Sequence, residues 1–474
     1  MNDPTALTLR EAATAIAQGR LRAEAMVEAC LDRIERLQPA LNCFIRVTAD
    51  AARAKAREAD LAVKAGRSLG PLHGVPLAHK DMFYRAGEVC TCGSKIRMDF
   101  IPDHTATVLS KLDGAGAIEL GRLNMAEFAM GPTGHNDHFG RCRNPWNSDH
   151  ITGGSSSGSG AAVAAGLAFG ALGSDTGGSV RLPAAACGIV GIKPTLGRVS
   201  RYGTMPLSHS LDCIGVLARN AGDCARLLGV IAGADTSDGM SSRSPVPDYE
   251  RGLDDAASTG SLASVTIGVP DRYYFDGVDH EVAELLAASR VVLEKRGAKI
   301  IDVPIGDHGA INDFSNAILW PEAAGLHLEW LRKRPQDYAP QTRARLLVGL
   351  GVPATLYVEA VRGRARLLEE LLRETFSKCD VLHIPVLKRS VPTAAETDVG
   401  GSAAMAQVLG QIVANTRPFN VLGLPGLSVP IGFTRNRLPQ AMQLVARPFR
   451  EDLLFRVGAA YEAASGGHTE RPPL

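Results

Sequence analysis

The 474-residue sequence predicts an α/β fold. Short apolar segments bounded by glycine and proline alternate along the chain with amphipathic segments of helical period, which is the pattern of a sheet covered by helices. The high content of glycine, 50 residues, together with 27 prolines indicates many turns and close backbone packing rather than disorder. A chain of this length can bury a large core, and it leaves room for about three domains or one large one.

Charge and cysteine content exclude several classes of protein. The 51 basic and 50 acidic side chains nearly cancel, so no surface field favours nucleic acid as a partner. The first residues lack a basic start followed by an apolar core, and no run reaches the ~18 apolar residues of a membrane span, so we expect a cytoplasmic protein with no membrane partner. The nine scattered cysteines do not form a disulfide framework, and Cys90, Cys92 and His104 match no common zinc spacing. We therefore expect no metal and no organic cofactor.

The N-terminal segment is predicted to be a helical layer. Thr8 and Glu11 form a capping box that opens a helix ending near Gly19. A second helix over 23–37, a short strand over 42–47 and an Ala-rich helix over 50–64 follow.

The next segment carries a buried strand with a lysine at its end. In GPLHGVPLAHKDMF, the apolar run 75–78 leads directly to Lys80. A helix over 104–114, a strand over 117–120 and a long irregular loop over 128–145 come next, then strands over 167–173, 189–192 and 214–217 and a helix over 223–232.

A polar stretch, 235–264, precedes a predicted βαβ unit. It consists of a strand over 265–269, a helix capped by Asp279 and ended by Gly297, and a strand over 299–305. Residues 310–376 are mostly helical with breaks at 334–341 and 349–353, and their aromatic side chains are expected to pack in the core rather than to line a pocket: Phe314, Trp320, Trp330 and Tyr357. The chain ends with a strand over 380–386, a helix over 403–415, two strands within 419–433 and 441–448, and a helix over 451–464.

The stretch 150–183, HITGGSSSGSGAAVAAGLAFGALGSDTGGSVRLP, contains two serines that each follow a pair of glycines, Ser155 and Ser179. Two glycines before a serine allow backbone N–H groups to point at one spot in front of the hydroxyl, as an oxyanion hole requires. A flexible linker would show the same glycine and serine content, but linkers do not contain an apolar run such as 161–173.

A serine needs a base before it can attack a carbonyl carbon, and no histidine stands with a carboxylate in a hydrolase motif. The G-x-S-x-G elbow is also absent around both serines. A buried lysine whose pKa is depressed can replace histidine, which makes Lys80 the candidate base. The residues alone do not rank Ser155 against Ser179.

The segment GGSSSGSGAAVAAGLAFGALGSDTGGSVRLPAA resembles the signature of the amidase signature family, and GVPLAHKD resembles the lysine motif of that family. The similarity continues through GRLNMAEFAMG, RNPWN, GIVGIKPTLGRVSRYG and GLPGLSVPIGF. It implies an amidase signature fold, with a large twisted mixed β-sheet covered by helices on both faces. It also implies a single domain over 1–474, made of a helical layer (1–66), the signature core (67–234), a variable substrate-shaping region (235–380) and a return to the core sheet (381–474).

The resemblance also implies a Ser–Ser–Lys triad. Ser179 is the expected nucleophile, Ser155 lies on a cis peptide bond and passes protons, and Lys80 is the neutral base. The expected oxyanion donors are the N–H groups of Thr176, Gly177, Gly178 and Ser179, the expected supports of the loop are Asp175 and Arg181, and the expected substrate contacts are Met130 and Gly131. Ser157 stands where glycine is more usual, which affects the local loop rather than the triad.

Three nearby histidines are not expected to take part in catalysis. His79 should point to the opposite side of its strand from Lys80, because neighbours on a strand alternate. His135 and His138, in the irregular loop, are expected to be solvated or hydrogen-bonded.

The predicted function is hydrolysis of an amide, carbamate, hydrazide or urea-type bond through an acyl-enzyme on Ser179. The expected partners are a small amide-type substrate and water, with a homodimer possible. One alternative is the glutaminase component, the A subunit, of the tRNA-dependent glutamine amidotransferase, because NMAEFAMG and GRVSRYG are similar to segments of that component. The other alternative is a pseudo-amidase that binds without catalysis, which the presence of all three triad residues disfavours.

Overall fold

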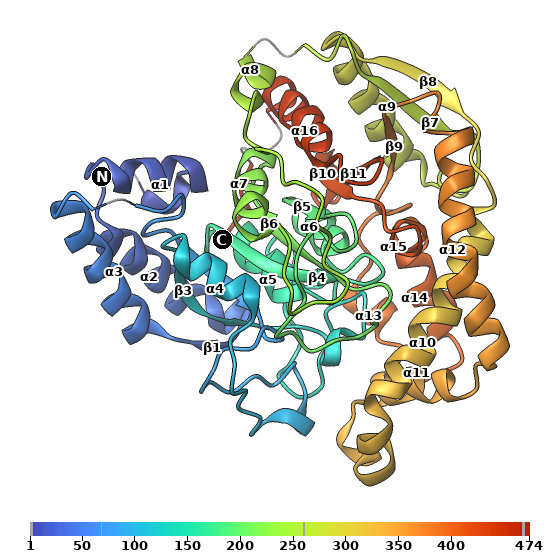
Figure 1. Ribbon diagram of the computed structural model, residues 1–474, viewed down its shortest axis with the longest axis horizontal. Coiled ribbons are helices and arrows are strands. Elements are labelled where there is room, and N and C mark those ends of the chain that lie inside the picture. Colours follow the sequence, from blue (N-terminus) through green and yellow to red (C-terminus); the bar gives the residue numbers. More distant parts are fainter. Residues whose placement is uncertain (1–2, 68, 259–260, 467–469) are drawn as a thin grey trace.

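The computed structural model describes residues 3–67, 69–258, 261–466 and 470–474. Within these residues, eleven strands form one mixed sheet that runs through the whole molecule (Figure 1). In spatial order the strands are β1 (Phe44–Val47), β3 (Ile118–Leu123), β2 (Pro76–Lys80), β4 (Gly170–Asp175), β6 (Cys213–Ala218), β5 (Val190–Lys193), β10 (Gly426–Phe433), β11 (Pro439–Ala446), β9 (Val381–Pro385), β7 (Thr266–Pro270) and β8 (Lys299–Val303).

The sheet is parallel near its two ends and antiparallel in the middle. Strand β2 pairs in parallel with β3 and β4, and β7 pairs in parallel with β8 and β9. The strands from β4 to β9, through β6, β5, β10 and β11, pair antiparallel, and so does β1 with β3. The α/β class and the βαβ unit formed by β7 and β8 are thereby confirmed.

Helices cover both faces of the sheet. Helices α5 (Ser157–Ala164) and α6 (Arg181–Cys187) pack on one face, and α7 (Ala221–Ile231), α9 (His280–Lys295) and α16 (Glu451–Ser465) pack on the other. The alternation along β10 shows this, because Gly426 faces Arg181 of α6 whereas Leu427 and Val429 face Gly458 of α16. The large mixed sheet covered on both faces is therefore present as the resemblance implied.

The predicted N-terminal layer consists of α1 (Leu9–Ala17), α2 (Ala23–Leu41) and α3 (Ala49–Lys64), which gather at the β1 end of the sheet (Figure 1). Thr8 and Glu11 form the predicted capping box: the Glu11 N–H donates to Thr8 Oγ1, and the Thr8 N–H donates to Glu11 Oε2.

Toward the other side of the molecule lie the long helices α10 (His308–Lys333), α11 (Pro340–Leu350) and α12 (Ala354–Glu374), seen at the right of Figure 1. Their breaks fall where the sequence predicts them. Shorter helices complete the described chain: α4 (Thr107–Gly114), α8 (Leu253–Ser258), α13 (Ala394–Thr397), α14 (Met405–Val413), α15 (Arg417–Val421) and the 3₁₀ turns Pro4–Ala6, Lys95–Arg97, Glu127–Ala129 and Pro335–Asp337.

Several sequence-based assignments need correction. Helices α5 and α6 were not predicted, because their glycine, serine and alanine residues are buried on all sides and give no amphipathic stripe. Strand β4 begins at Gly170 rather than residue 167, and α14 covers only Met405–Val413 of the predicted 403–415. Asp279 occupies the N-cap of α9, but its side chain makes no capping hydrogen bond.

All nine cysteines are buried free thiols. In the described parts of the chain, no single helix is long and apolar enough to cross a membrane, and the pair α11 and α12, which passes that test only when joined, is bent by 92°.

Candidate active site

Lys80 is the last residue of β2 and is fully buried. Its Nζ donates hydrogen bonds to Ser155 Oγ at 2.6 Å and to Ser174 Oγ at 2.8 Å. Strands β2 and β4 pair in parallel, and this pairing brings Lys80 and Ser174 to the same edge of the sheet although they are far apart in the chain. The structure therefore joins the two motifs that the sequence singles out.

Ser155 lies in the loop that leads into α5, and the Gly154–Ser155 peptide bond is cis, as the resemblance implies. The two glycines before it have no room for a side chain. A Cβ at Gly153 would lie 2.8 Å from the backbone of Leu182, and a Cβ at Gly154 would lie 2.6 Å from the carbonyl oxygen of Gly131. This close packing fixes the Ser155 backbone between α6 and the loop that carries Gly131.

Burial sets the protonation state of Lys80. Desolvation lowers the pKa of its ammonium group from 10.5 to about 7, against smaller opposing effects of Asp212 and Asp175. A lysine with such a pKa is deprotonated in a large fraction of molecules near neutral pH. The neutral amine can then accept a proton from Ser155.

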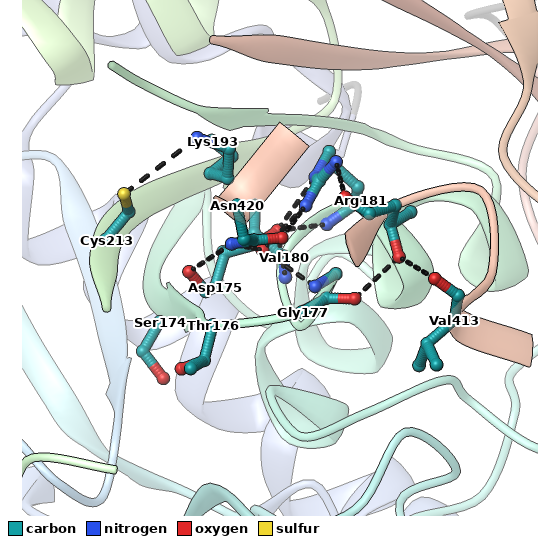
Figure 2. Close-up of polar contacts among 12 residues, drawn as sticks. Ser174, Asp175, Thr176, Gly177, Val180, Arg181, Lys193, Cys213, Val413 and Asn420 are labelled. Carbon is teal, nitrogen blue, oxygen red and sulfur yellow. Dashed lines mark hydrogen bonds and ion pairs between the residues drawn. The ribbon is translucent and has the colours of Figure 1, made fainter. Parts of the chain in front are cut away.

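Ser179 lies between β4 and α6, in a loop that Asp175 holds from inside (Figure 2). The Asp175 carboxylate accepts hydrogen bonds from the N–H groups of Gly178 at 2.8 Å and Val180 at 3.2 Å. It also accepts from Arg181 Nε at 3.0 Å and Nη2 at 2.8 Å. Although burial raises the pKa of Asp175, the charge and hydrogen bonds of Arg181 lower it well below its usual range.

The loop is also tied to the C-terminal part of the chain. Asn420 Nδ2 donates to the Asp175 carboxylate and carbonyl, both at 2.9 Å, and Thr416 Oγ1 donates to the Gly177 carbonyl oxygen at 2.6 Å (Figure 2). Arg181 Nη1 donates to Gln443 Oε1 at 2.5 Å. Asp175 and Arg181 thus hold the loop by hydrogen bonds to its backbone and to α15, β11 and each other.

A second buried carboxylate holds the other side of the loop. Thr176 Oγ1 donates to Asp212 Oδ1 at 2.5 Å, and Asp212 Oδ2 accepts from the N–H groups of Leu207 at 2.8 Å and Ser208 at 3.0 Å. Ser208 Oγ in turn donates to Glu322 Oε2 of α10 at 2.5 Å. Through this chain of contacts, the loop that carries Ser179, the loop around Leu207 and α10 are held together.

The Gly178 N–H differs from the other N–H groups expected to bind an oxyanion. It points at Asp175 Oδ1, so in this geometry it supports the loop instead of facing substrate. The candidate donors for an oxyanion therefore narrow to the N–H groups of Thr176, Gly177 and Ser179.

A cavity of about 40 Å³ opens beside Ser179. Its wall consists of Ala129, Met130, Gly131, Pro132, Thr176, Gly177, Ser179, Leu207, Leu319, Trp320, Arg345, Val413 and Arg417. An outer cavity of about 560 Å³ shares Trp320, Arg345 and Arg417 with it. Larger cavities in the described part of the chain, of about 760, 670 and 640 Å³, are lined by other residues and contain no member of the Ser–Ser–Lys set.

Met130 and Gly131, the predicted substrate contacts, line the same cavity as Ser179. They follow Phe128 and Ala129, which both have positive φ, 49° and 61°. Buried Glu127 anchors this turn by accepting hydrogen bonds from Ser94 Oγ at 2.6 Å and the Ala339 N–H at 3.0 Å. Non-glycine residues adopt such φ values where surrounding contacts enforce them, and here these contacts shape the part of the cavity wall that holds Met130 and Gly131.

The three histidines lie outside this cavity. Burial lowers the pKa of His79 to about 4, and its Nδ1 accepts a hydrogen bond from the Leu172 N–H. His138 Nε2 lies 2.9 Å from Glu127 Oε1, and this hydrogen bond raises the pKa of His138. His135 Nε2 lies 3.1 Å from Thr397 Oγ1. Each of the three has a hydrogen-bond partner away from Ser179.

Sequence reasoning missed several residues of the site. Ser174 lies within β4, Asp212 directly precedes β6, and Thr416 belongs to a segment without a recognisable motif. Trp320, expected in the core, lines the cavity, whereas Trp330 stacks on Phe128 with ring centroids 5.5 Å apart. Only the pairing of distant strands and helices reveals these positions.

Buried serine and lysine side chains thus lie together at one edge of the sheet of an α/β fold, and similarity to known proteins identifies the family. The amidase family model matches residues 25–455. The chain belongs to the amidase family, and it is an amidase-signature hydrolase.

Three relatives illustrate this similarity. The A subunit of the glutamyl-tRNA(Gln) amidotransferase of Roseiflexus sp. (strain RS-1) is 38% identical over 99% of this chain and 98% of its own. The structure of the corresponding protein from Thermotoga maritima superposes with a TM-score of 0.82 at 30% identity, covering 98% of this chain and 96% of its own. The peptide amidase of Stenotrophomonas maltophilia superposes with a TM-score of 0.84 at 28% identity, covering 98% of both chains.

Proposed function

We propose that the chain hydrolyses an amide-type carbon–nitrogen bond through an acyl-enzyme on Ser179, with Ser155 and Lys80 as the proton relay. The single observation that carries the proposal is the 2.6 Å hydrogen bond between Lys80 Nζ and Ser155 Oγ, next to the loop of Ser179. A pKa of about 7 for Lys80 supports its role as a base.

The proposed reaction proceeds in two stages. Ser179 Oγ bonds to the substrate carbonyl carbon while its proton passes to Ser155 Oγ and the Ser155 proton passes to Lys80 Nζ. The N–H groups of Thr176, Gly177 and Ser179 stabilise the oxyanion. The carbon–nitrogen bond then breaks, and the proton returns through Ser155 to the leaving nitrogen.

In the second stage a water molecule attacks the acyl-enzyme. Its proton passes to Lys80 through Ser155, the ester bond to Ser179 breaks, and the proton returns to Ser179 Oγ. The products are a carboxylic acid and ammonia or an amine, and the side chains regain their starting protonation.

A fluorophosphonate probe tests the assignment, because it phosphonylates an activated serine. We expect the probe to label Ser179 and the Ser179→Ala variant to lose both labelling and amide hydrolysis while keeping the unfolding temperature of the wild type. Ser402→Ala, which alters an exposed serine, is the matched control and should behave as the wild type. Labelling at Ser155, or turnover by Ser179→Ala, would overturn the assignment, and a complete lack of labelling would favour a binding protein without catalysis.

A second candidate function is glutamine hydrolysis within a tRNA-dependent amidotransferase. It is supported by the name of relatives that match over almost the full length of both chains, at 38% and 39% identity. In this function the chain would act together with partner proteins in a tRNA-dependent reaction. The near-zero net charge of the chain, by contrast, predicts no nucleic-acid partner. A glutaminase assay with and without those partner proteins tests it, and a rate that rises only when they are added would support this candidate.

A further inference from the structure

Two buried arginines form part of the wall of the cavity at Ser179. Arg345 comes from α11 and Arg417 from the start of α15, and their residues are 6% and 7% exposed. Both line the small cavity and the outer cavity, and the Trp320 ring lies near both, 5.5 Å from Arg345 Cζ and 5.8 Å from Arg417 Cζ. The pair therefore stands where the two cavities meet.

Arg417 is close to the nucleophile loop. A Cβ built on Gly177 would lie 3.2 Å from Arg417 Cγ and 3.5 Å from its Nε. Gly177 thus allows the arginine side chain to pass directly over the loop that holds Ser179. One substrate molecule can therefore place its carbonyl at Ser179 and another of its groups against the Arg417 guanidinium.

Neither guanidinium forms an ion pair with a carboxylate in the described part of the chain. Arg417 Nη1 donates to the amide oxygen of Asn316 at 2.8 Å, which is a neutral acceptor. Burial lowers the pKa of Arg345 to about 9, with Arg417 adding repulsion, and burial lowers the pKa of Arg417 to about 10. Buried cations without a counter-charge are costly, and an anionic ligand supplies what is missing.

The walls also indicate which ligands are disfavoured. The residues that line the small cavity include no aspartate and no glutamate, and the carboxylate on the outer cavity is that of Asp313. An ammonium group close to the scissile carbonyl would face two guanidinium groups without a counter-charge. The small cavity, about 40 Å³, leaves room for only a short chain between that carbonyl and the arginines.

We propose that Arg345 and Arg417 together bind a carboxylate on the acyl part of the substrate, so that the preferred substrate is a short amide that bears a carboxylate and no ammonium group. One planar guanidinium can donate two parallel hydrogen bonds to the two oxygens of a carboxylate, and the second guanidinium can donate to a remaining lone pair of the same group. The proposal rests on the proposed amide hydrolysis at Ser179 and specifies its substrate class.

The test compares three amides of similar length: glutaramate, which carries a carboxylate; pentanamide, which is neutral; and glutamine, which adds an ammonium group. We expect the wild type to show a kcat/KM for glutaramate at least tenfold above the values for the other two. Arg345→Gln and Arg417→Gln should each reduce this preference by tenfold or more, chiefly through KM. Arg343→Gln, which alters an arginine of α11 outside both cavities, should keep the wild-type ratios.

A binding measurement separates this proposal from the catalytic one. Glutarate should raise the unfolding temperature of Ser179→Ala, and glutaramide, its neutral diamide, should not. The shift should disappear in Ser179→Ala combined with Arg345→Gln. Equal shifts with glutarate and glutaramide, or a preference for pentanamide or glutamine over glutaramate, would overturn the carboxylate site. Failure of the proposed hydrolysis would instead appear as no turnover of any amide, with the glutarate shift still present.

Discussion

Two groups of helices and strands meet at Ser179, and each contains buried cations. They form two walls, which differ in whether these cations have a carboxylate partner within the chain. On the wall built from β4, α6 and β11, Arg181 faces the carboxylate of Asp175 and donates to Gln443. On the wall built from α10, α11 and α15, Arg345 and Arg417 lack a carboxylate partner among the described residues. A buried cation that is paired with a carboxylate of the chain helps to hold the backbone in place. A buried cation without a carboxylate partner is available to bind an anionic ligand.

Lys80, at the end of β2, contacts the first wall through Ser174 of β4, but within the described residues it lacks an ion-pair partner as the arginines of the second wall do. It is buried and its ammonium group lacks an ion-pair partner in the described chain, so its pKa falls to about 7 and its neutral form becomes accessible. Lysine loses its proton under these conditions, whereas the arginines, with pKa values of about 9 and 10, keep theirs at neutral pH. The same kind of burial therefore makes a neutral amine accessible in one place and leaves charged guanidinium groups in the other.

The largest effect is expected for Lys80→Met, which keeps the length of the side chain and removes the amine. We expect the rate of amide hydrolysis to fall by about 10⁴-fold, at the upper end of what general base catalysis contributes. Initial rates at saturating substrate measure this loss. A variant that keeps more than a tenth of the wild-type rate would show that Lys80 is not the base.

The stability of Lys80→Met provides the control for folding. The unfolded lysine holds its proton up to about pH 10.5 and the folded one releases it above about pH 7, so the wild type gains stability as the pH rises between these values. Lys80→Met has no amine to titrate, so its free energy of unfolding should lack this rise with pH. The difference in free energy of unfolding, variant minus wild type, should therefore be about 2 kcal/mol larger at pH 7 than at pH 9. Urea unfolding at both pH values measures it, and a difference that is independent of pH would contradict the lowered pKa.

A pair of arginine variants tests the comparison of the walls directly. Arg181→Met leaves the buried Asp175 carboxylate without its counter-charge and should cost about 3–5 kcal/mol in free energy of unfolding. Arg345→Met removes a cation that has no counter-charge and should be neutral or stabilise the protein by about 1 kcal/mol. Urea unfolding without ligand measures both. Equal losses in the two variants would show that the walls do not differ.

The residues predicted to form the Ser–Ser–Lys triad leave a clearer pattern in the sequence than the arginines of the second wall, and the reason is physical. Lys80, Ser155 and Ser179 stand beside glycines, prolines and small residues, because their backbones must pack closely and bend sharply. These requirements leave a recognisable local pattern. Most of the strand and helix alternation, including the capping box at Thr8, is local in the same way.

Arg345, Arg417 and Trp320 leave no such pattern. Each lies on or at the start of an ordinary helix, and what makes it part of the site is the missing counter-charge and the approach of α10, α11 and α15 to the nucleophile loop. Partners such as Asp212 and Glu322 are likewise brought together only by the fold. Contacts over such long separations in the chain cannot be derived from local spacing.

The central claim is that a neutral Lys80 activates Ser179, and the pH dependence of Ser179 modification by a fluorophosphonate tests it most directly. The reagent carries no ionisable group, so the rate reports the protein alone. We predict a rate that rises about tenfold per pH unit below pH 7, levels off above it, and loses this inflection in Lys80→Met. A rate that does not change between pH 5 and pH 9, or an inflection near pH 7 that persists in Lys80→Met, would contradict the account.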